Sequence, residues 1–167
     1  NYAFNGCTNL SSISLPACTT FTSFMFFDCP NLSYILLGVS TLSSSTFEGD
    51  TNLQTIELPK CTTIGNYAFR SCTNLTKVNF PLYSSTQLNI FTSCTSLADI
   101  TLGMMTIVSG AFTTYSTLQR VKFPSCSTVG STAFQKLANL KEINFPVCTQ
   151  VMPNAFSGCT SLTSISL

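Results

Sequence analysis

The stretch CTTIGNYAFRSCTNLTKVNFP, residues 61–81, holds a phrase that recurs along the whole chain. Its Ala-Phe pair, Ala68 and Phe69, is followed by Leu75, and the same spacing returns at a step of about 22 residues, which is typical of a solenoid repeat. No single repeat of this length can bury its own apolar face, so we expect consecutive coils to stack on one another. Aligned on the Phe, the copies stand at Phe4, Phe26, Phe47, Phe69, Phe91, Phe112, Phe134 and Phe156.

Each repeat also contains one predicted strand. After Leu53 come Ile56, Leu58 and Pro59, an alternation of apolar residues closed by proline that indicates a short strand. One strand per coil predicts a parallel sheet, with alternate side chains directed into the core and outward. Between strands, the pattern I-G-x-x-A-F-x-x-C spaces apolar residues by about three, which predicts helical turns or short 3-10 segments rather than long helices.

The composition is that of a folded, weakly charged protein. The 167 residues are 44% hydrophobic with 14 Phe, enough for a sizeable core, and only 8% charged. The net charge of +1 argues against nucleic-acid binding through a broad basic field, and no apolar run reaches the roughly 18 residues of a membrane span. Because the chain begins with Asn1 and both ends fall inside a repeat, we expect one repeat domain over residues 1–167, a fragment of a longer array from which any targeting signal has been lost.

The full phrase from Leu53 to Leu75, L-x-x-I-x-L-P-x-C-x-x-I-G-x-x-A-F-x-x-C-x-x-L, resembles the BspA-like (Treponema pallidum type) leucine-rich repeat, and the resemblance covers essentially the whole chain. It implies a leucine-rich-repeat solenoid: a right-handed coil of about eight repeats, with a parallel β-sheet on the concave face and short irregular or 3-10 segments on the convex face. Members of that family are typically surface proteins. The resemblance therefore also implies an extracellular, cell-surface location and a role in adhesion or partner binding.

Some repeats depart from the phrase. The segment 82–89 lacks the Ile-Gly pair, with Thr86 at the position of Ile64, and the turns after Gly38 and Gly103 are one residue short. We expect these coils to bulge or to pack less tightly than the others.

Nine cysteines fall into two columns of the repeat. The chain has no His and no C-x-x-C motif, so the ligand spacing of a zinc site is missing, and neither a metal nor another cofactor is predicted. Same-column neighbours such as Cys72 and Cys94 come near disulfide reach in stacked coils, but in-register parallel side chains have unfavourable geometry for the bond. We therefore predict buried free thiols that act as small apolar residues, at Cys7, Cys29, Cys72, Cys94 and Cys159 and at Cys18, Cys61, Cys126 and Cys148.

The sequence shows no catalytic machinery. The absence of His excludes Ser-His and Cys-His arrangements. Glu48 and Asp50 are close in sequence, but their segment stands where another repeat has Arg-Ser-Cys at residues 70–72. We interpret the segment as a solvated turn rather than an acid–base pair, and we predict that the protein is not an enzyme.

The positions that the repeat leaves variable are the outward-facing residues of the strands. One outward column contains Lys77, Asp99, Arg120 and Glu142, whose charges alternate in sign, so adjacent strands are predicted to hold them as cross-strand pairs. This face carries seven charged residues, a strong bias in a protein with only seven basic and six acidic residues. The candidate ligand-binding residues on the concave face are Tyr34, Leu36, Glu57, Lys77, Asp99, Arg120, Lys122, Lys141 and Glu142.

Two interpretations of this face stay open. The charge alternation can serve only to avoid like-charge repulsion and keep the face soluble, since exposed ion pairs are weak. Alternatively, the face binds a ligand. Lys122 and Lys141 lack an obvious partner in their columns and suit an acidic ligand, while Tyr34 beside Leu36 is a common kind of interface anchor.

Three functions suit a solenoid in general. The leading hypothesis is a non-catalytic adhesion module that binds a host or neighbouring-cell protein or glycan through the concave face. The alternative is a structural spacer that displays another domain and has no ligand of its own. Ice binding requires a regular Thr ladder, and the mixture of Lys, Asp, Tyr and Leu in the outward columns argues against it.

Overall fold

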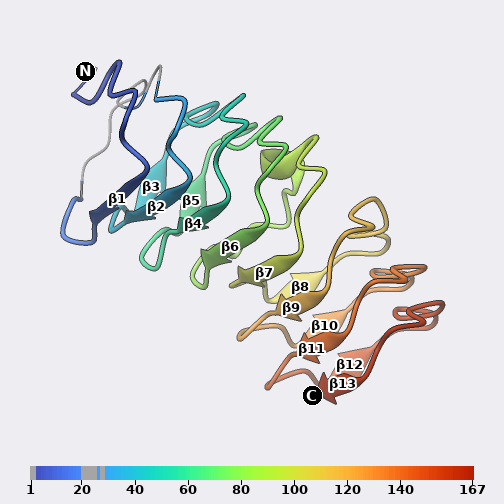
Figure 1. The fold of residues 1–167 in the computed structure, drawn as a ribbon. Coiled ribbons are helices and arrows are strands. Elements are labelled where there is room, and N and C mark those ends of the chain that lie inside the picture. The colour runs from blue at the N-terminus through green and yellow to red at the C-terminus, as the bar shows by residue number, and fades with distance from the viewer. Residues whose placement is uncertain (1–2, 20–25, 27–28) are drawn as a thin grey trace.

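The computed structural model describes residues 3–19, 26 and 29–167. Its coils stack from the N-terminal end to the C-terminal end, and each contributes one strand to a main sheet (Figure 1). Neighbouring strands of this sheet are parallel, so the predicted leucine-rich-repeat solenoid is confirmed. In spatial order the main sheet consists of β1 (Ser12–Leu15), β2 (Tyr34–Leu37), β4 (Thr55–Glu57), β6 (Lys77–Phe80), β7 (Asp99–Leu102), β9 (Arg120–Lys122), β11 (Glu142–Asn144) and β13 (Ser164–Ser166).

The strands of the main sheet pair in register, so each repeat position forms a column across it. Val78 of β6 lies opposite Ile56 of β4 and Ile100 of β7, and all three side chains are buried. Lys77 and Asn79, on either side of Val78, keep solvent exposure. The alternation of the sequence therefore places the outward columns as predicted.

The Ile-Gly part of the repeat also forms strands, where helical turns or 3-10 segments were predicted. The one helix in the described part of the chain is η1 (Asn89–Phe91), a 3-10 helix. No helix among the described residues is long and apolar enough to cross a membrane. The extra strands form a two-stranded sheet, β3 (Thr41–Leu42) with β5 (Thr63–Ile64), and a three-stranded sheet, β8 (Thr106–Ile107), β10 (Thr128–Val129) and β12 (Gln150–Val151).

At β5, a glycine allows the close approach of neighbouring coils that accompanies this strand pairing. The Gly65 N–H donates to the Leu42 carbonyl oxygen at 2.8 Å. A Cβ on Gly65 would lie only 2.3 Å from the backbone nitrogen of Ser44. The glycine thus lets one backbone lie against the next, and that backbone contact favours an extended pairing that periodicity within one repeat does not predict.

The departing repeats behave in two different ways. The shortened turns at Gly38 and Gly103 pack tightly, so the expectation of looser packing is wrong there: a Cβ on Gly38 would lie 1.9 Å from the Pro16 carbonyl oxygen. At a shortened turn the backbone lies directly against the preceding coil, and only glycine, which has no Cβ, fits at this distance. By contrast, residues 82–89 contribute no strand between β5 and β8. The extra strands therefore form two separate small sheets, one on each side of this coil.

A column of phenylalanines runs through the core, as predicted. The rings of Phe47 and Phe69 stack with centroids 5.7 Å apart, and those of Phe112 and Phe134 with centroids 4.9 Å apart. Stacked aromatic pairs stabilise a core beyond their buried area. Among the described residues, no polar or charged side chain is buried in this core. The column is interrupted once, because Phe91 and Phe112, both described, make no ring contact with each other.

The cysteine prediction holds in part. Burial raises the pKa of Cys94 to about 12, so this residue stays a thiol at neutral pH. Buried thiols also donate hydrogen bonds to the preceding coil, a role beyond that of an apolar residue: Cys72 Sγ lies 3.0 Å from the Phe47 carbonyl oxygen. The buried free thiols are Cys61, Cys72, Cys94 and Cys126, whereas Cys7, Cys18, Cys29, Cys148 and Cys159 are only partly buried.

Candidate binding face

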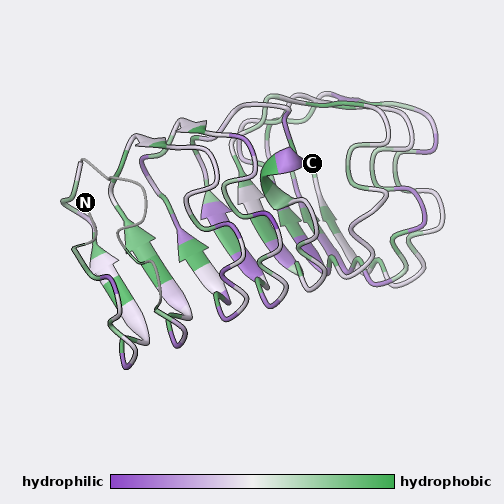
Figure 2. Ribbon diagram, turned by 90° about the horizontal axis from the view of Figure 1, so that it is seen from above, coloured by the Kyte–Doolittle hydropathy of each residue, from purple (hydrophilic) through white to green (hydrophobic). Residues whose placement is uncertain are grey.

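The outer face of the main sheet, which we define as the outward side chains of β4, β6, β7, β9 and β11, carries most of the predicted binding residues. Seen from above, hydrophilic residues gather on the strands in the middle of the sheet, whereas β2 near the N-terminus is mostly hydrophobic (Figure 2). Tyr34 and Leu36 lie on β2, are half-buried, and therefore stand apart from the charged region. Two outward columns cross the charged region: Lys77, Asp99, Arg120, Glu142 and, beside them, Glu57, Asn79, Thr101, Lys122, Asn144.

One ion pair organises the centre of this face. Arg120 Nη2 on β9 lies 2.7 Å from Asp99 Oδ2 on β7, directly across the strand pair. The hydrogen bond and the negative charge of Asp99 raise the pKa of Arg120, and Glu142 adds a smaller effect in the same direction. The pair therefore forms as predicted from the column.

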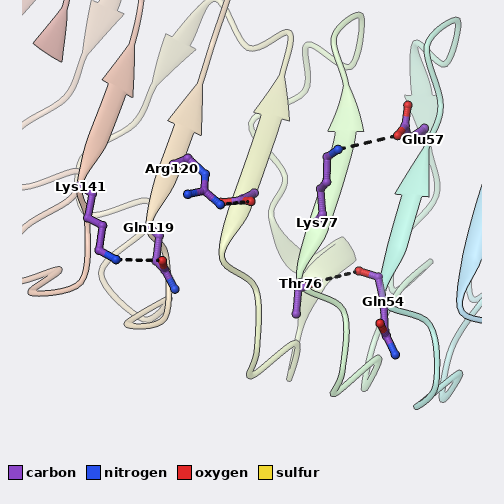
Figure 3. A network of polar contacts seen from close by, with 8 residues as sticks. Gln54, Glu57, Thr76, Lys77, Gln119, Arg120 and Lys141 are labelled. Carbon is purple, nitrogen blue, oxygen red and sulfur yellow. Dashed lines mark hydrogen bonds and ion pairs between the residues drawn. The ribbon is translucent and has the colours of Figure 1, made fainter. Parts of the chain in front are cut away.

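The ammonium group of Lys77 contacts a different carboxylate from the predicted one. Its Nζ lies 3.9 Å from Glu57 Oε1 on the preceding strand, although Lys77 also stands opposite Asp99 in register (Figure 3). Asp99 is already bound by Arg120, so the ammonium group reaches the carboxylate on its other side. Of the three cross-strand pairs that this column of four residues predicts, Asp99 with Arg120 forms, whereas Lys77 with Asp99 and Arg120 with Glu142 do not form as ion pairs among the described residues.

Lys141 has a hydrogen-bond partner in its own column, the uncharged Gln119. Its Nζ donates to Gln119 Oε1 at 3.3 Å, across to the neighbouring strand segment (Figure 3). A similar step occurs earlier in the sheet, where Thr76 Oγ1 donates to the Gln54 carbonyl oxygen at 3.1 Å. The expectation that Lys141 lacks a partner is thus wrong.

Two charged groups on this face remain without a hydrogen bond or an ion pair among the described residues. Lys122 on β9 stands opposite Asn144 and Thr101, neither of which is charged. Glu142 on β11 stands opposite Arg120, whose guanidinium is held by Asp99. One cation and one anion are therefore available to a ligand.

These two groups line a shallow hollow of about 390 Å³ on the outer face, a size within the about 300–1,000 Å³ typical of binding sites. One oxygen of Asp99, Oδ1, is buried there without a hydrogen-bond partner. Among the predicted site residues, the hollow brings together Lys77, Asp99, Arg120, Lys122 and Glu142.

Four predicted residues, Tyr34, Leu36, Glu57 and Lys141, do not line the hollow. Sequence reasoning missed Thr101 and Asn144, which do line it. Both stand in the second outward column, so column membership was the signal that pointed to them. Neither side chain is charged, whereas most of the predicted binding residues are.

The carboxylates of Glu48 and Asp50 do not form an acid–base pair. Glu48 Oε1 is held 3.0 Å from Arg70 Nε. Asp50 is not on a solvated turn as predicted but half-buried, and desolvation raises its pKa to about 6. Among the described residues, no group of three or more His, Cys, Asp or Glu side chains is arranged to hold a metal ion.

Comparison with known proteins identifies the family of the repeat. The model of the BspA type leucine rich repeat region matches residues 1–98 and 40–163, with six copies. The solved T. pallidum leucine rich repeat protein is similar in structure, with a TM-score of 0.56 and 26% sequence identity. That match covers 78% of this chain, and the chain spans 64% of the length of that protein.

Two further solved structures are more distant. A leucine rich cell surface protein from Faecalibacterium prausnitzii A2-165 shows 21% identity and a TM-score of 0.41, covering 99% of this chain and 50% of its own. An internalin from Listeria monocytogenes str. 4b F2365 shows 12% identity and a TM-score of 0.49, covering 96% of this chain and 62% of its own. No curated protein sequence matches the chain.

The family match extends over nearly the whole chain, and the described coils have the strand, Phe and Leu positions that the repeat phrase requires. The chain belongs to the BspA-type leucine-rich repeat family.

Proposed function

We propose that this protein is a non-catalytic recognition module that binds a host or neighbouring-cell protein or glycan through the outer face of the main sheet, at a cell surface. The observation that carries the proposal is the hollow on this face, lined by a cation and an anion, Lys122 and Glu142, that the described residues leave unpaired. Unpaired charges at a rim or hollow steer and orient a charged partner. The cell-surface part of the proposal rests on the family resemblance alone.

The same geometry favours recognition over catalysis. Two ion pairs, Arg120 with Asp99 and Lys77 with Glu57, join charged side chains of neighbouring strands on this face. The sequence contains no His, the side chain that serves most often in general acid–base chemistry. A polar, shallow face suits a folded protein surface or a glycan.

A binding screen tests the proposal. The 167-residue chain is immobilised and probed with extracellular-matrix proteins and glycans, beside the double variant Lys122→Ala and Glu142→Ala. A matched control carries Lys60→Ala and Glu48→Ala, which remove one exposed cation and one exposed anion away from the hollow. We expect a ligand whose affinity falls about tenfold in the first variant and is unchanged in the control.

Two results would contradict this function. A ligand that both variants bind as tightly as the unchanged chain would place recognition elsewhere on the solenoid. The absence of any ligand for a chain shown to be folded would instead support the spacer role.

A further inference from the structure

Lys122 and Glu142, the two charged groups of the outer face without an ion pair among the described residues, stand in a diagonal relationship across β9 and β11. Arg120 lies opposite Glu142 in register, and Lys122 follows Arg120 by two residues. A strand spacing of about 4.8 Å and a rise of about 3.3 Å per residue put the Cα atoms of Lys122 and Glu142 about 8 Å apart. One cation and one anion therefore project side by side into the same hollow.

The same diagonal is closed by an ion pair elsewhere in the sheet. Glu57 on β4 stands one strand before Lys77 on β6, and Thr55, two residues before Glu57, lies opposite Lys77. This pair repeats the placement of Lys122 and Glu142, with the charges exchanged. Lys77 Nζ lies 3.9 Å from Glu57 Oε1 (Figure 3). A lysine and a glutamate at these two positions can therefore reach each other, and Lys122 and Glu142 have that option as well.

The charges that line the hollow are balanced once its ion pairs are counted. The ion pairs of Asp99 with Arg120 and of Lys77 with Glu57 each contain one charge of either sign, although Glu57 itself lies outside the lining. The two remaining charged groups add one more of each sign. Such a balanced site attracts neither a pure anion nor a pure cation through a broad field. The positions of the individual charges, rather than their total, therefore select the ligand.

A partner with a single charge meets an opposing group at this site. An anion on Lys122 comes near the carboxylate of Glu142. A cation on Glu142 comes near the ammonium group of Lys122 and the guanidinium of Arg120. Juxtaposed like charges suppress such partners. Either ion also competes with the attraction between Lys122 and Glu142 themselves.

We propose, resting on the recognition function proposed above, that the hollow binds a protein surface that presents one acidic and one basic side chain next to each other. The partner's carboxylate binds Lys122, and its ammonium or guanidinium group binds Glu142. This partner forms two ion pairs across the interface where the face by itself can form one. It also brings the opposite charge to each group that it contacts.

The spacing of the two groups suits a polypeptide partner. Side chains two residues apart in an extended strand project to the same side, about 6.6 Å from each other. Residues three or four apart on a helix are also neighbours, and acidic and basic residues often pair there. Both arrangements set opposite charges at nearly the separation of Lys122 and Glu142. Thr101 and Asn144, which line the hollow beside them, add uncharged groups that can hydrogen-bond to the partner's backbone.

The test measures four capped peptides by nuclear magnetic resonance on the isotope-labelled 167-residue chain. All have the same glycine–serine background, and two variable positions lie two residues apart. These positions hold glutamate and lysine in the first peptide, glutamate and glutamine in the second, glutamine and lysine in the third, and two glutamines in the fourth. We expect the first peptide to shift the signals of Lys122 and Glu142 with an affinity about three- to fivefold higher than the second or third, the gain from one exposed ion pair.

Two single variants separate the roles of the two charges. Lys122→Met and Glu142→Gln each remove one charge at nearly constant size, and both are expected to weaken the doubly charged peptide about three- to fivefold. Glu142→Gln should strengthen binding of the anionic peptide, because Lys122 loses its competitor, and Lys122→Met should strengthen binding of the cationic peptide. Lys60→Ala, at an exposed cation away from the hollow, is the control and should change none of the affinities.

Several results would overturn the inference. These are a singly charged peptide that binds as tightly as the doubly charged one, a doubly charged peptide that either variant leaves unchanged, and a set of peptides of which none shifts the signals of the face. An oligosaccharide of glucuronic acid is measured beside the peptides, and tighter binding than that of the doubly charged peptide would assign the hollow to acidic glycans instead. The recognition function itself fails only if the binding screen returns no ligand that the double variant Lys122→Ala and Glu142→Ala loses, so the two failures are distinguishable.

Discussion

The guanidinium of Arg120 lies 2.7 Å from the carboxylate of Asp99 on the neighbouring strand, and this contact decides which charges of the outer face stay available. Because Asp99 is engaged, Lys77 turns to Glu57 on its other side. Because Arg120 is engaged, Glu142 keeps its charge for a partner. The outer face therefore has two ion pairs, Asp99 with Arg120 and Lys77 with Glu57, and two charged residues without an ion pair among the described residues, Lys122 and Glu142.

Replacing Asp99 by Asn is expected to release Arg120 and to raise the positive potential of the outer face, where Lys77 and Lys122 lie near it. The variant should elute from a cation exchanger at higher salt than Glu48→Gln, which causes the same change of net charge and frees Arg70 elsewhere. Equal elution of the two variants would show that the charges of the face do not act together.

Replacing Phe134 by Ala is expected to reduce the free energy of unfolding by about 3–5 kcal/mol, since a buried ring and its cavity are both lost. Phe134 is fully buried and stacks with Phe112 at 4.9 Å and with Phe156 at 5.3 Å. The matched variant Phe156→Ala, at a partly exposed ring, should cost clearly less in urea denaturation. Equal losses would mean that the Phe column does not stabilise the solenoid through burial.

Thiol labelling should separate the cysteines by burial. Iodoacetamide modifies the thiolate, so Cys148, partly exposed, is expected to react in the native protein, while Cys72 and Cys94 react only after unfolding. Desolvation raises the pKa of both buried thiols, that of Cys94 to about 12. Mass spectrometry of native and urea-treated samples measures the difference, and rapid native labelling of Cys94 would contradict the burial.

Asp50 should make stability depend on pH. It occupies the column position that Cys72 has in the next coil, and desolvation raises its pKa from 3.8 to about 6. A carboxyl with a higher pKa in the folded state holds its proton more tightly when folded, so stability is greatest below about pH 4 for this group and falls as pH rises to about 6.

Replacing Asp50 by Asn should therefore flatten this fall and raise stability at neutral pH, by at most about 3 kcal/mol at 1.36 kcal/mol per pKa unit. Urea denaturation from acidic to neutral pH measures the effect. Glu48→Gln, at an exposed carboxylate held by Arg70, serves as the control and should keep the slope. A slope that survives in Asp50→Asn would assign the pH dependence to another group.

The sequence by itself determined the stacking of coils, the place of each main strand and the membership of the outward columns. A constant repeat step makes equivalent residues neighbours, so Lys77, Asp99 and Arg120 had to share a column once their coils stacked in register. The same step aligned Phe47 with Phe69 in the core. The segment 82–89 was recognisable because Thr86 stands at the position of Ile64, and the structure departs there.

Only the tertiary structure decided the contacts between coils. Column order places Lys77 opposite Asp99 on one neighbouring strand and opposite Thr55 on the other, where Glu57 follows two residues later. It does not say whether the ammonium group of Lys77 contacts Asp99 or Glu57, because that depends on the other partners of each carboxylate. The extra strands arise from backbone pairing with a neighbouring coil, which the periodicity within one repeat does not reveal. The hydrogen bond of Phe91 is of the same kind: its N–H donates to the Leu88 carbonyl oxygen, whereas the N–H of Phe112 donates to Ala133 of the next coil, and this difference becomes visible only when both backbones are placed.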